Sequence, residues 1–274
     1  MTIKTEDFML CESITEEEAM LLNDTNNIAN IKMDGIRIIA VVMDNQAVLV
    51  NRRGHLCNFS FEEVVEDVSK MPNGIYDGEV ISYCDTFNKI QRRAGTKDRR
   101  KQIELKKEIP AKYVVFDILN LNKEYITNKP LKERIVIMKK VFEEYNKQFT
   151  DRKSCVELID YKPIKELLEQ AHKEDREGII VKDLNATYQH KRSNAWRKCK
   201  FFLETTIKIC SYTENNKGIR AEDGIGNVVQ IAGEQCNEVK QLLQSQKEVE
   251  IHLQYLEKTA EGRFRFPSYR GLVK

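Results

Sequence analysis

The sequence lacks any long hydrophobic segment. Its longest apolar run, Ile38 to Met43, is far shorter than the roughly 20 residues that a membrane-spanning helix needs, so we expect no membrane partner. The N-terminus is acidic and has no hydrophobic stretch, which argues against a secretory signal. With 274 residues, the chain is long enough for roughly two domains whose cores need no disulfide or structural metal.

Closely spaced cysteines are also missing. The seven cysteines are scattered and form no Cys-x-x-Cys pair, a pattern typical of a reducing cytosol rather than of a zinc ribbon or a disulfide framework. The four histidines are equally dispersed, so the sequence predicts neither a histidine metal site nor a catalytic triad. We therefore expect a cytoplasmic, intracellular protein, and the sequence is compatible with a viral or phage origin.

An overall excess of one charge is missing too, because 45 Lys and Arg nearly balance 43 Asp and Glu. The distribution is nevertheless uneven. The first 24 residues carry seven acidic side chains and one lysine, whereas residues 89–112 carry ten basic side chains and three acidic ones. A second basic cluster spans residues 190–200. A solvated surface is the ordinary explanation of one such run, but two separate clusters favour a groove for a polyanion.

The hydrophobic pattern predicts an α+β chain. We expect strands over 28–50, 75–83, 112–119 and 178–183, and helices over 60–71, 131–149 and 162–173. Ser60 and Glu63 have the spacing of a capping box for the first of these helices. Near residue 203 the pattern changes to a β-rich module with one helix, over 234–246. We therefore divide the chain into domains at 1–202 and 203–274.

One lysine stands in an unusual setting. Lys32-Met33-Asp34-Gly35-Ile36-Arg37 lies where one predicted strand turns into the next. An amine acts as a nucleophile only after it loses a proton, and neighbouring cations or desolvation favour that loss. The glycine would let the backbone approach a bulky ligand. In isolation the segment is better explained as an ordinary hairpin turn, for which Asp-Gly is common.

Further motifs follow in order. They are Asn51-Arg52-Arg53-Gly54, Asp77-Gly78-Glu79, Val115-Phe116-Asp117, Glu177 to Lys182, and Trp196 to Lys200. Lys198 and Lys200 would share one face of a strand, as suits a phosphate. Each piece has an ordinary explanation alone, and Phe116 in particular is a typical core residue.

Taken in order, these six motifs resemble the covalent nucleotidyltransferase superfamily, specifically ATP-dependent DNA ligases of minimal size. The resemblance extends from about residue 30 to residue 271. It implies a nucleotidyltransferase (adenylation) domain with antiparallel sheets and flanking helices, followed by a C-terminal OB-fold β-barrel. It also implies ATP and Mg²⁺ as cofactors, nicked duplex DNA as the partner, and action as a monomer.

The resemblance implies roles for individual positions. Lys32 is the expected nucleophile that attacks ATP and forms a lysyl-AMP, with Asp34, Lys198 and Lys200 as further catalytic residues. The expected ATP and AMP contacts are Ile31, Lys32, Arg37, Arg52, Glu79, Phe116, Lys182, Lys198 and Lys200. Glu79 and Glu177 are the expected metal ligands. Arg37, Arg52, Arg92 and Arg93 are expected to bind DNA.

Two departures from the family pattern stand out. Asn30 occupies a position where family members often carry a Glu that helps to read the adenine. After Arg265 to Leu272, family members continue with an Arg and an Asp-Lys pair, so we expect slower self-adenylylation where these are missing. Three alternatives stay open: an mRNA capping guanylyltransferase, an RNA ligase, and an inactive nick-binding module.

Overall fold

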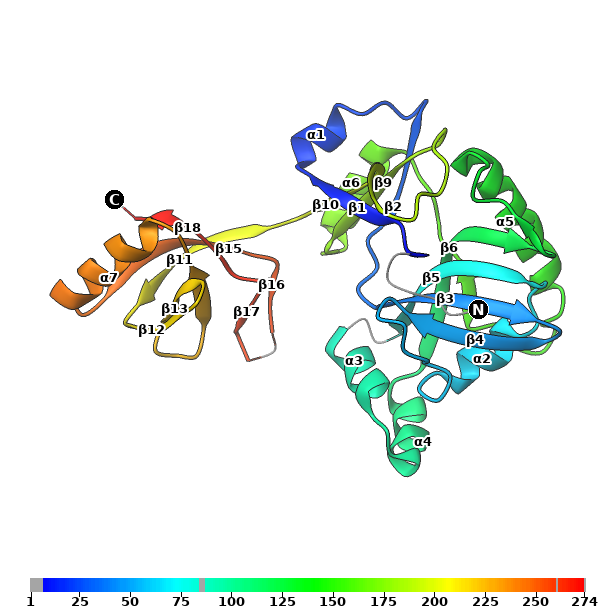
Figure 1. Ribbon diagram of the computed structural model, residues 1–274, viewed down its shortest axis with the longest axis horizontal. Coiled ribbons are helices and arrows are strands. Elements are labelled where there is room, and N and C mark those ends of the chain that lie inside the picture. Colours follow the sequence, from blue (N-terminus) through cyan, green and yellow to red (C-terminus); the bar gives the residue numbers. More distant parts are fainter. Residues whose placement is uncertain (1–6, 84–86, 260, 274) are drawn as a thin grey trace. The chain divides into compact units, whose positions relative to one another are not determined.

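The computed structural model describes residues 7–83, 87–259 and 261–273 (Figure 1). The chain forms two compact units, one ending at Cys199 and the other beginning at Lys200. Strand β10 ends at Lys200 and β11 begins at Leu203, on either side of the predicted domain boundary. Each unit is described by itself.

The first unit contains two sheets. The larger sheet has the order β4 (Gln46–Asn51), β3 (Ile36–Met43), β5 (Gly74–Ser82), β6 (Ala111–Leu121) and β7 (Glu124–Tyr125), all antiparallel, and β8 (Val156–Leu158) pairs with β6 in parallel. The smaller sheet has the order β1 (Leu10–Ile14), β10 (Arg192–Lys200), β9 (Gly178–Asp183) and β2 (Asn27–Ile31). Here β2 is antiparallel to β9, and β1 is parallel to β10.

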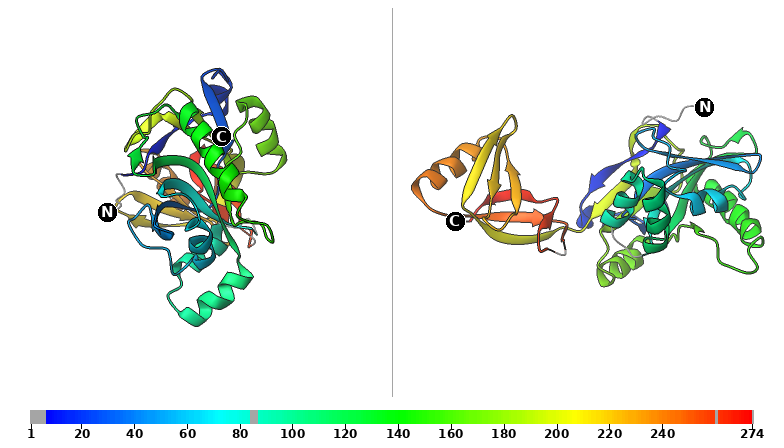
Figure 2. Two further views of the ribbon diagram at one scale, coloured as in Figure 1. Left: turned by 90° about the vertical axis from the view of Figure 1, so that its right-hand side faces the viewer. Right: turned by 90° about the horizontal axis from the view of Figure 1, so that it is seen from below.

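The helices of this unit lie outside the two sheets. Helices α2 (Glu62–Val68) and α5 (Leu131–Asn146) contribute to a core against one face of the larger sheet (Figures 1 and 2). Helix α6 (Ile164–Lys173) packs on β2 and β9, and the short α1 (Glu16–Met20) contacts α6. Helices α3 (Phe87–Gly95) and α4 (Arg99–Glu108) lie between β5 and β6 in the chain.

Strand β3 explains the longest apolar run of the sequence. Ile38, Ala40 and Val42 enter the core that α2 and α5 cover. Ile39 faces the opposite way and enters a second core, which also contains Phe116 of β6 and Trp196 of β10. Because successive side chains of a strand alternate between its faces, a strand buried on both faces reads as a continuous hydrophobic run.

The second unit is mostly β structure. One three-stranded sheet has the order β11 (Leu203–Ile209), β15 (Val249–Tyr255), β18 (Ser268–Leu272), and another has the order β12 (Ser211–Asn215), β13 (Gly218–Glu222), β14 (Val228–Ile231). A two-stranded sheet pairs β16 (Glu257–Lys258) with β17 (Phe264–Arg265). Helix α7 (Gln235–Ser245) places Val239 in a core with strand residues such as Ile209 and Ile251. This is the β-rich module with one helix that the sequence pattern predicts.

Most long elements lie where the sequence predicts them, but the prediction of a capping box for α2 is wrong. The N-cap residue is Phe61, and no side chain caps the helix. The Ser60 hydroxyl instead donates to the carbonyl oxygen of Ala94, and Glu63 binds Arg93. Both side chains are therefore used by α3, whose position is not visible in the local sequence.

Candidate active site

A cavity of about 240 Å³ opens in the first unit, lined by residues from both sheets. Strands β1, β2, β9 and β10 of the smaller sheet contribute one set of residues, and β3, β5 and β6 of the larger sheet contribute another. The lining residues are Leu10, Cys11, Asn30, Ile31, Lys32, Met33, Arg37, Arg52, Glu79, Phe116, Ile180, Lys182, Arg192, Trp196 and Lys198. Eight of the residues expected from the sequence to bind nucleotide are among them.

Lys32 lies in the connection from β2 to β3, as the sequence predicts. Its backbone N–H donates to the carbonyl oxygen of Gly178 over 2.9 Å, and its ammonium forms an ion pair with Glu177. The exposed fractions of these two side chains are 21% and 9%. The amine is thus held at the cavity wall, paired with a carboxylate.

Gly35 lets the connection that carries Lys32 pack directly against β5. A Cβ atom at this position would lie 2.3 Å from the carbonyl oxygen of Val80 and 2.6 Å from the side chain of Ile81. Both distances are too short for any side chain, so only glycine fits. The expectation that this glycine admits a ligand is therefore corrected: the chain's own strand occupies the space.

Glu79 is the one carboxylate among the described residues that line the cavity. It pairs with Arg37 across the β3–β5 ladder. Burial raises the pKa of the Glu79 carboxyl to about 7, although the charges of Lys32 and Arg37 lower it. Its protonation therefore responds to charge placed nearby, including the charge of a nucleotide.

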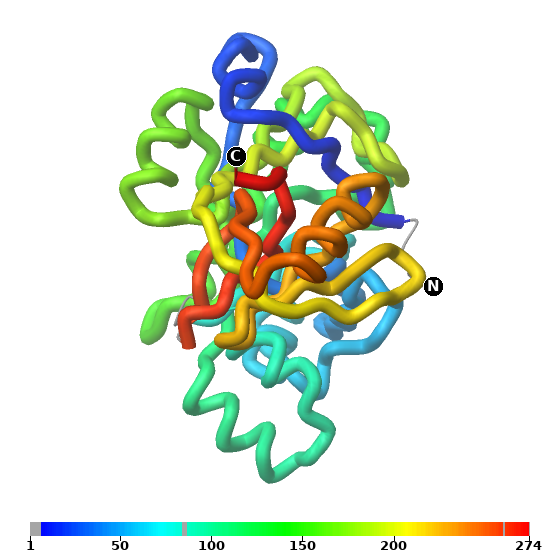
Figure 3. Tube along the Cα trace, turned by 90° about the vertical axis from the view of Figure 1, so that its left-hand side faces the viewer, coloured from blue at the N-terminus to red at the C-terminus, as the bar shows by residue number. Residues whose placement is uncertain are grey.

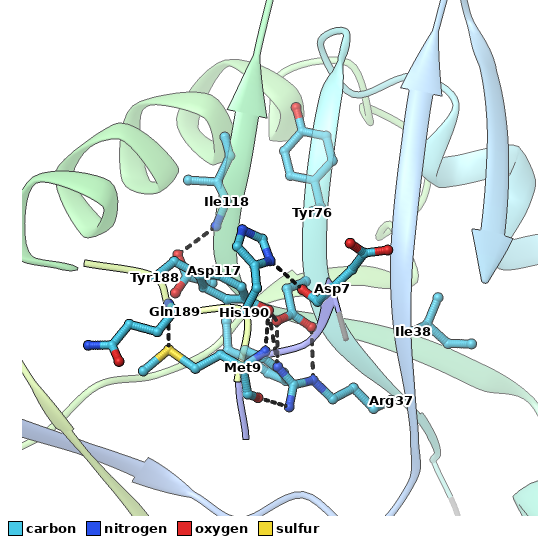
Figure 4. Close-up of polar contacts among 12 residues, drawn as sticks. Asp7, Met9, Arg37, Ile38, Tyr76, Asp117, Ile118, Tyr188, Gln189 and His190 are labelled. Atoms are coloured by element: carbon cyan, nitrogen blue, oxygen red, sulfur yellow. Dashed lines mark hydrogen bonds and ion pairs between the residues drawn. The ribbon is translucent and has the colours of Figure 1, made fainter. Parts of the chain in front are cut away.

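Arg37 is tied into the interior beside the cavity. Its guanidinium makes two hydrogen bonds to Asp77, of 3.0 and 2.6 Å, and a third of 2.6 Å to the carbonyl oxygen of Met9. Figure 4 shows Arg37, Met9 and Tyr188 converging. Burial lowers the pKa of Arg37, but Asp77, Tyr188 and Cys11 together raise it more, so that the pKa lies above its ordinary value and the guanidinium is charged. Arg37 thus joins β3, β5 and the N-terminal segment while it lines the cavity, and its expected contacts with nucleotide and DNA stay predictions.

Aromatic rings form the apolar side of the cavity. Phe116 and Trp196 meet edge to face, with ring centroids 5.8 Å apart. The ammonium of Lys182 lies 4.2 Å from the Trp196 ring centroid and hydrogen-bonds to the Tyr161 hydroxyl over 3.0 Å. Burial lowers the pKa of Lys182 to about 8, even though Asp117 and Asp77 raise it. Phe116 is thus both a core residue and a cavity residue.

Asn30 leaves a buried acceptor beside this apolar wall. Its amide nitrogen donates to the carbonyl oxygen of Ile31 over 2.8 Å, and the residue is only 3% exposed. Its Oδ1 atom has no hydrogen-bond partner among the described residues. A buried acceptor without a partner costs about 1–3 kcal/mol, which a ligand donor would recover.

Five predicted residues lie outside the cavity lining. Asp34 is in the connection that carries Lys32, and its charge acts on Glu79. Glu177 does not line the cavity, but it forms an ion pair with Lys32, which does. Lys200 belongs to the second unit, where its ammonium lies 5.3 Å from the Phe266 ring centroid.

The other two are the neighbouring arginines of α3. Arg92 is 54% exposed and forms an ion pair with Glu108, so it is accessible to a partner. The expectation that Arg93 contacts DNA is wrong. Arg93 is 1% exposed, and its two terminal nitrogens bind Glu63 at 2.6 Å each. A buried guanidinium that is committed to a carboxylate cannot reach a phosphate.

The cavity carries an excess of positive charge. Among its described lining residues, six are Lys or Arg and one is an acid. Aromatic rings together with lysine and arginine side chains suit a ligand with a planar base and phosphates.

Residues 8–200 match the family model of the ATP-dependent DNA ligase domain. This chain belongs to that family. The matched range contains every residue that lines the cavity. The family predicted from the sequence is therefore confirmed.

Known ligases are similar to this ligase domain in sequence and fold. The SPbeta prophage-derived DNA ligase-like protein LigB of Bacillus subtilis is 28% identical over 214 residues, which cover 76% of this chain and 72% of that protein. A DNA ligase of Nanoarchaeum equitans is 30% identical over 198 residues, which cover 69% of this chain but only 35% of the relative. A solved Lig E DNA ligase has a TM-score of 0.66 at 14% identity, over 97% of this chain and 98% of that structure. The last match supports the predicted fold of an adenylation domain followed by an OB-like barrel.

Sequence reasoning missed the contribution of the N-terminal segment to this ligase domain. Leu10 and Cys11 of β1 line the cavity because β1 pairs with β10. Arg192 also lines it, and its guanidinium donates to the carbonyl oxygen of Cys11. The basic cluster of residues 190–200 was a signal for Arg192, but no local pattern indicates the parallel pairing of β1.

No described helix is both long and apolar enough to cross a membrane. Nor do the described His, Cys, Asp and Glu residues form a group of three that could hold a metal.

Proposed function

We propose that this chain is an ATP-dependent DNA ligase that seals nicks with a 5′-phosphate and a 3′-hydroxyl through a lysyl-AMP at Lys32. The observation that carries the proposal is the position of Lys32. Its amine lies at the wall of a cation-rich cavity and is paired with a mostly buried carboxylate. The chain spans most of the prophage relative but about a third of the archaeal one, so its activity as a separate protein is part of the proposal.

In the first step, the Lys32 nitrogen attacks the α-phosphate of ATP. A bond forms between this nitrogen and phosphorus, the bond to the β-phosphate oxygen breaks, and pyrophosphate leaves. The proton of Lys32 passes to Glu177, the carboxylate with which its ammonium is paired. The adenine would lie beside Phe116 and Trp196, and the phosphates near Lys198 and Arg52.

Mg²⁺ fits the residues at this site. It commonly uses one or two carboxylates together with phosphate oxygens, so a group of three protein ligands is not needed. Glu177 is paired with Lys32, and the charge of Lys32 acts on Glu79, so the amine lies near both carboxylates. When bound, Mg²⁺ would neutralise charge on the phosphates.

The two later steps transfer the nucleotide to DNA and release it. AMP passes from Lys32 to the 5′-phosphate of the nick, and the 3′-hydroxyl then attacks that phosphate and displaces AMP. Phosphoryl transfers of this kind depend on positioning and charge neutralisation. Arg52, an exposed cation at the cavity, is proposed to hold the 5′-phosphate.

Labelled nucleotides and nicked duplexes separate the alternatives. We expect labelling of the protein by ATP and sealing of nicked DNA. Labelling by GTP alone would identify a guanylyltransferase, and sealing of nicked RNA alone an RNA ligase. Nick binding without any adduct would identify an inactive module. Lys32→Ala should abolish the adduct while the folded state, checked by thermal melting, is retained.

We infer the cellular setting from the cysteines and from one relative. The described cysteines are all free thiols, which supports a reducing intracellular setting. The prophage-derived relative supports a phage-related origin. We infer that the protein acts as a monomer, and light scattering of the purified protein tests this.

A further inference from the structure

Helices α3 and α4 form a strongly basic hairpin, hereafter the basic hairpin, over residues 87–108. It carries nine Lys and Arg against three acidic residues, in a chain whose net charge is only +2. The rest of the chain is therefore net negative. Figures 1 and 3 show the hairpin at an edge of the first unit, with α4 beyond α3.

The hairpin is held rigidly at its base. Arg93 binds Glu63, donates to the carbonyl oxygen of Ile109 over 2.8 Å, and lies 5.3 Å from the Phe61 ring centroid. The Gln102 amide donates to the carbonyl oxygens of Arg93 and Thr96, at 2.7 Å each. These bonds connect α3 to α4 and connect both to the start of α2. Arg93 is thus a positioning residue.

The charges outside this base are exposed and poorly compensated. The exposed basic side chains include Lys89, Arg92, Lys97, Arg99, Arg100 and Lys101. Within the described part of the chain, Arg92 pairs with Glu108 and Arg99 pairs with Glu62, whereas Lys97, Arg100 and Lys101 form no ion pair. Like charges held together repel one another, so such a surface lowers its energy when a polyanion binds.

The hairpin also contacts β5, the strand against which the connection that carries Lys32 is packed. Gly35, in the same connection as Lys32, abuts Val80 and Ile81 at the end of β5. Strand β5 ends at Ser82, and α3 begins at Phe87. A duplex whose nick lies at the cavity could therefore extend along the hairpin. Duplex DNA presents one phosphate charge per about 1.7 Å of its axis, so even a short contact meets several phosphates.

We propose that the exposed surface of the basic hairpin, centred on Lys97, Arg100 and Lys101, binds the phosphate backbone of duplex DNA beside the nick. This inference rests on the proposed function for its substrate. It assigns the duplex contact to exposed residues of the hairpin and gives Arg93 the separate task of holding them in place.

The test compares two triple variants of equal charge change. One is Lys97→Ser, Arg100→Ser and Lys101→Ser. The control is Lys132→Ser, Lys139→Ser and Lys140→Ser, three exposed lysines of α5. Fluorescence anisotropy measures binding to a nicked duplex whose 3′ end lacks the hydroxyl, from 50 to 200 mM salt. Self-adenylylation and thermal melting are measured in parallel.

The plot of log affinity against log salt has a negative slope, and loss of three phosphate contacts makes it less steep by about 2.7. Over this salt range the wild type should therefore lose roughly 40-fold more affinity than the hairpin variant. The hairpin variant should bind at least tenfold more weakly at low salt and keep its adenylylation rate and melting temperature. Wild-type affinity and slope in the hairpin variant would overturn the proposal, as would an equal loss in the α5 control.

Failure of the proposed function would look different. In that case the wild type forms no AMP adduct, whereas the hairpin variant still binds the duplex more weakly than the wild type and the α5 control.

Discussion

Asn30 and Lys182 are two buried polar residues of the cavity that differ in whether their polar atoms have hydrogen-bond partners. Lys182 has the Tyr161 hydroxyl and the Phe116 carbonyl as partners. The Oδ1 atom of Asn30 has no partner among the described residues. Because the Asn30 amide nitrogen must face the Ile31 carbonyl oxygen, its orientation is fixed and the cavity retains an acceptor. This acceptor suits the amino group of adenine.

We predict that Asn30 makes the site prefer ATP over ITP, which carries a carbonyl in place of the amino group. Two acceptors would then oppose each other, and a penalty of about 1–3 kcal/mol gives a preference of roughly 5- to 150-fold. Asn30→Leu removes the acceptor and should lose the preference. Initial rates of adduct formation with each nucleotide measure it. Equal rates with ATP and ITP in the wild type would dismiss this role.

Lys182 should make the stability of the fold depend on pH. Its pKa is lowered from 10.5 to about 8, so between these values the unfolded chain binds more protons than the folded protein. The contribution of Lys182 to stability therefore rises with pH through this window, by about 3 kcal/mol in total, whereas the buried thiols of Cys57 and Cys155, whose pKa values burial raises, act in the opposite direction. Urea titrations at pH 8 and pH 10 should therefore show the free energy of unfolding of the wild type rising by about 2 kcal/mol relative to that of Lys182→Met. The exposed control Lys165→Met should behave as the wild type. An equal change with pH in the wild type and in Lys182→Met would contradict the assignment.

At the scale of elements, the α3–α4 hairpin shows where local patterns mislead. Ser60 and Glu63 have the spacing of a capping box, yet both interact with α3 instead. Of two neighbouring arginines in α3, Arg93 is buried and Arg92 is exposed. The difference depends on Glu63, which binds Arg93 and lies 30 residues from it in the chain. Strand β1 shows the same limit, since its place depends on pairing with β10. By contrast, β3, β5, β6 and α5 follow their own hydrophobic patterns and were predictable.

These neighbouring arginines provide a matched pair of variants. Arg93→Ala leaves Glu63 in a mostly buried site without its partner, and we predict a loss of about 3 kcal/mol in the free energy of unfolding. Arg92→Ala removes an exposed ion pair and should cost about 1 kcal/mol or less. Denaturant titration of both variants measures the difference. Similar losses for the two would contradict the anchoring role of Arg93.

At the scale of the whole molecule, the order of the motifs was the most informative feature of the sequence. Lys32, Glu79, Phe116, Lys182 and Lys198 come from separate stretches, and the structure brings them to one cavity. Spacing alone does not reveal this, because the cavity forms only where two sheets face each other. The side chains that support the site, such as Asp77 beneath Arg37, depend equally on that packing. The near-zero net charge likewise conceals a basic hairpin and a cation-rich cavity.

The measurement that tests the account most directly is the location of AMP on the protein. The purified chain is incubated with ATP and Mg²⁺, its intact mass is compared with that of Lys32→Ala, and the modified peptide is then sequenced by mass spectrometry. We predict a single AMP on Lys32 and none on the variant. AMP on another lysine of the cavity, such as Lys182 or Lys198, or the same adduct on Lys32→Ala, would contradict the central claim.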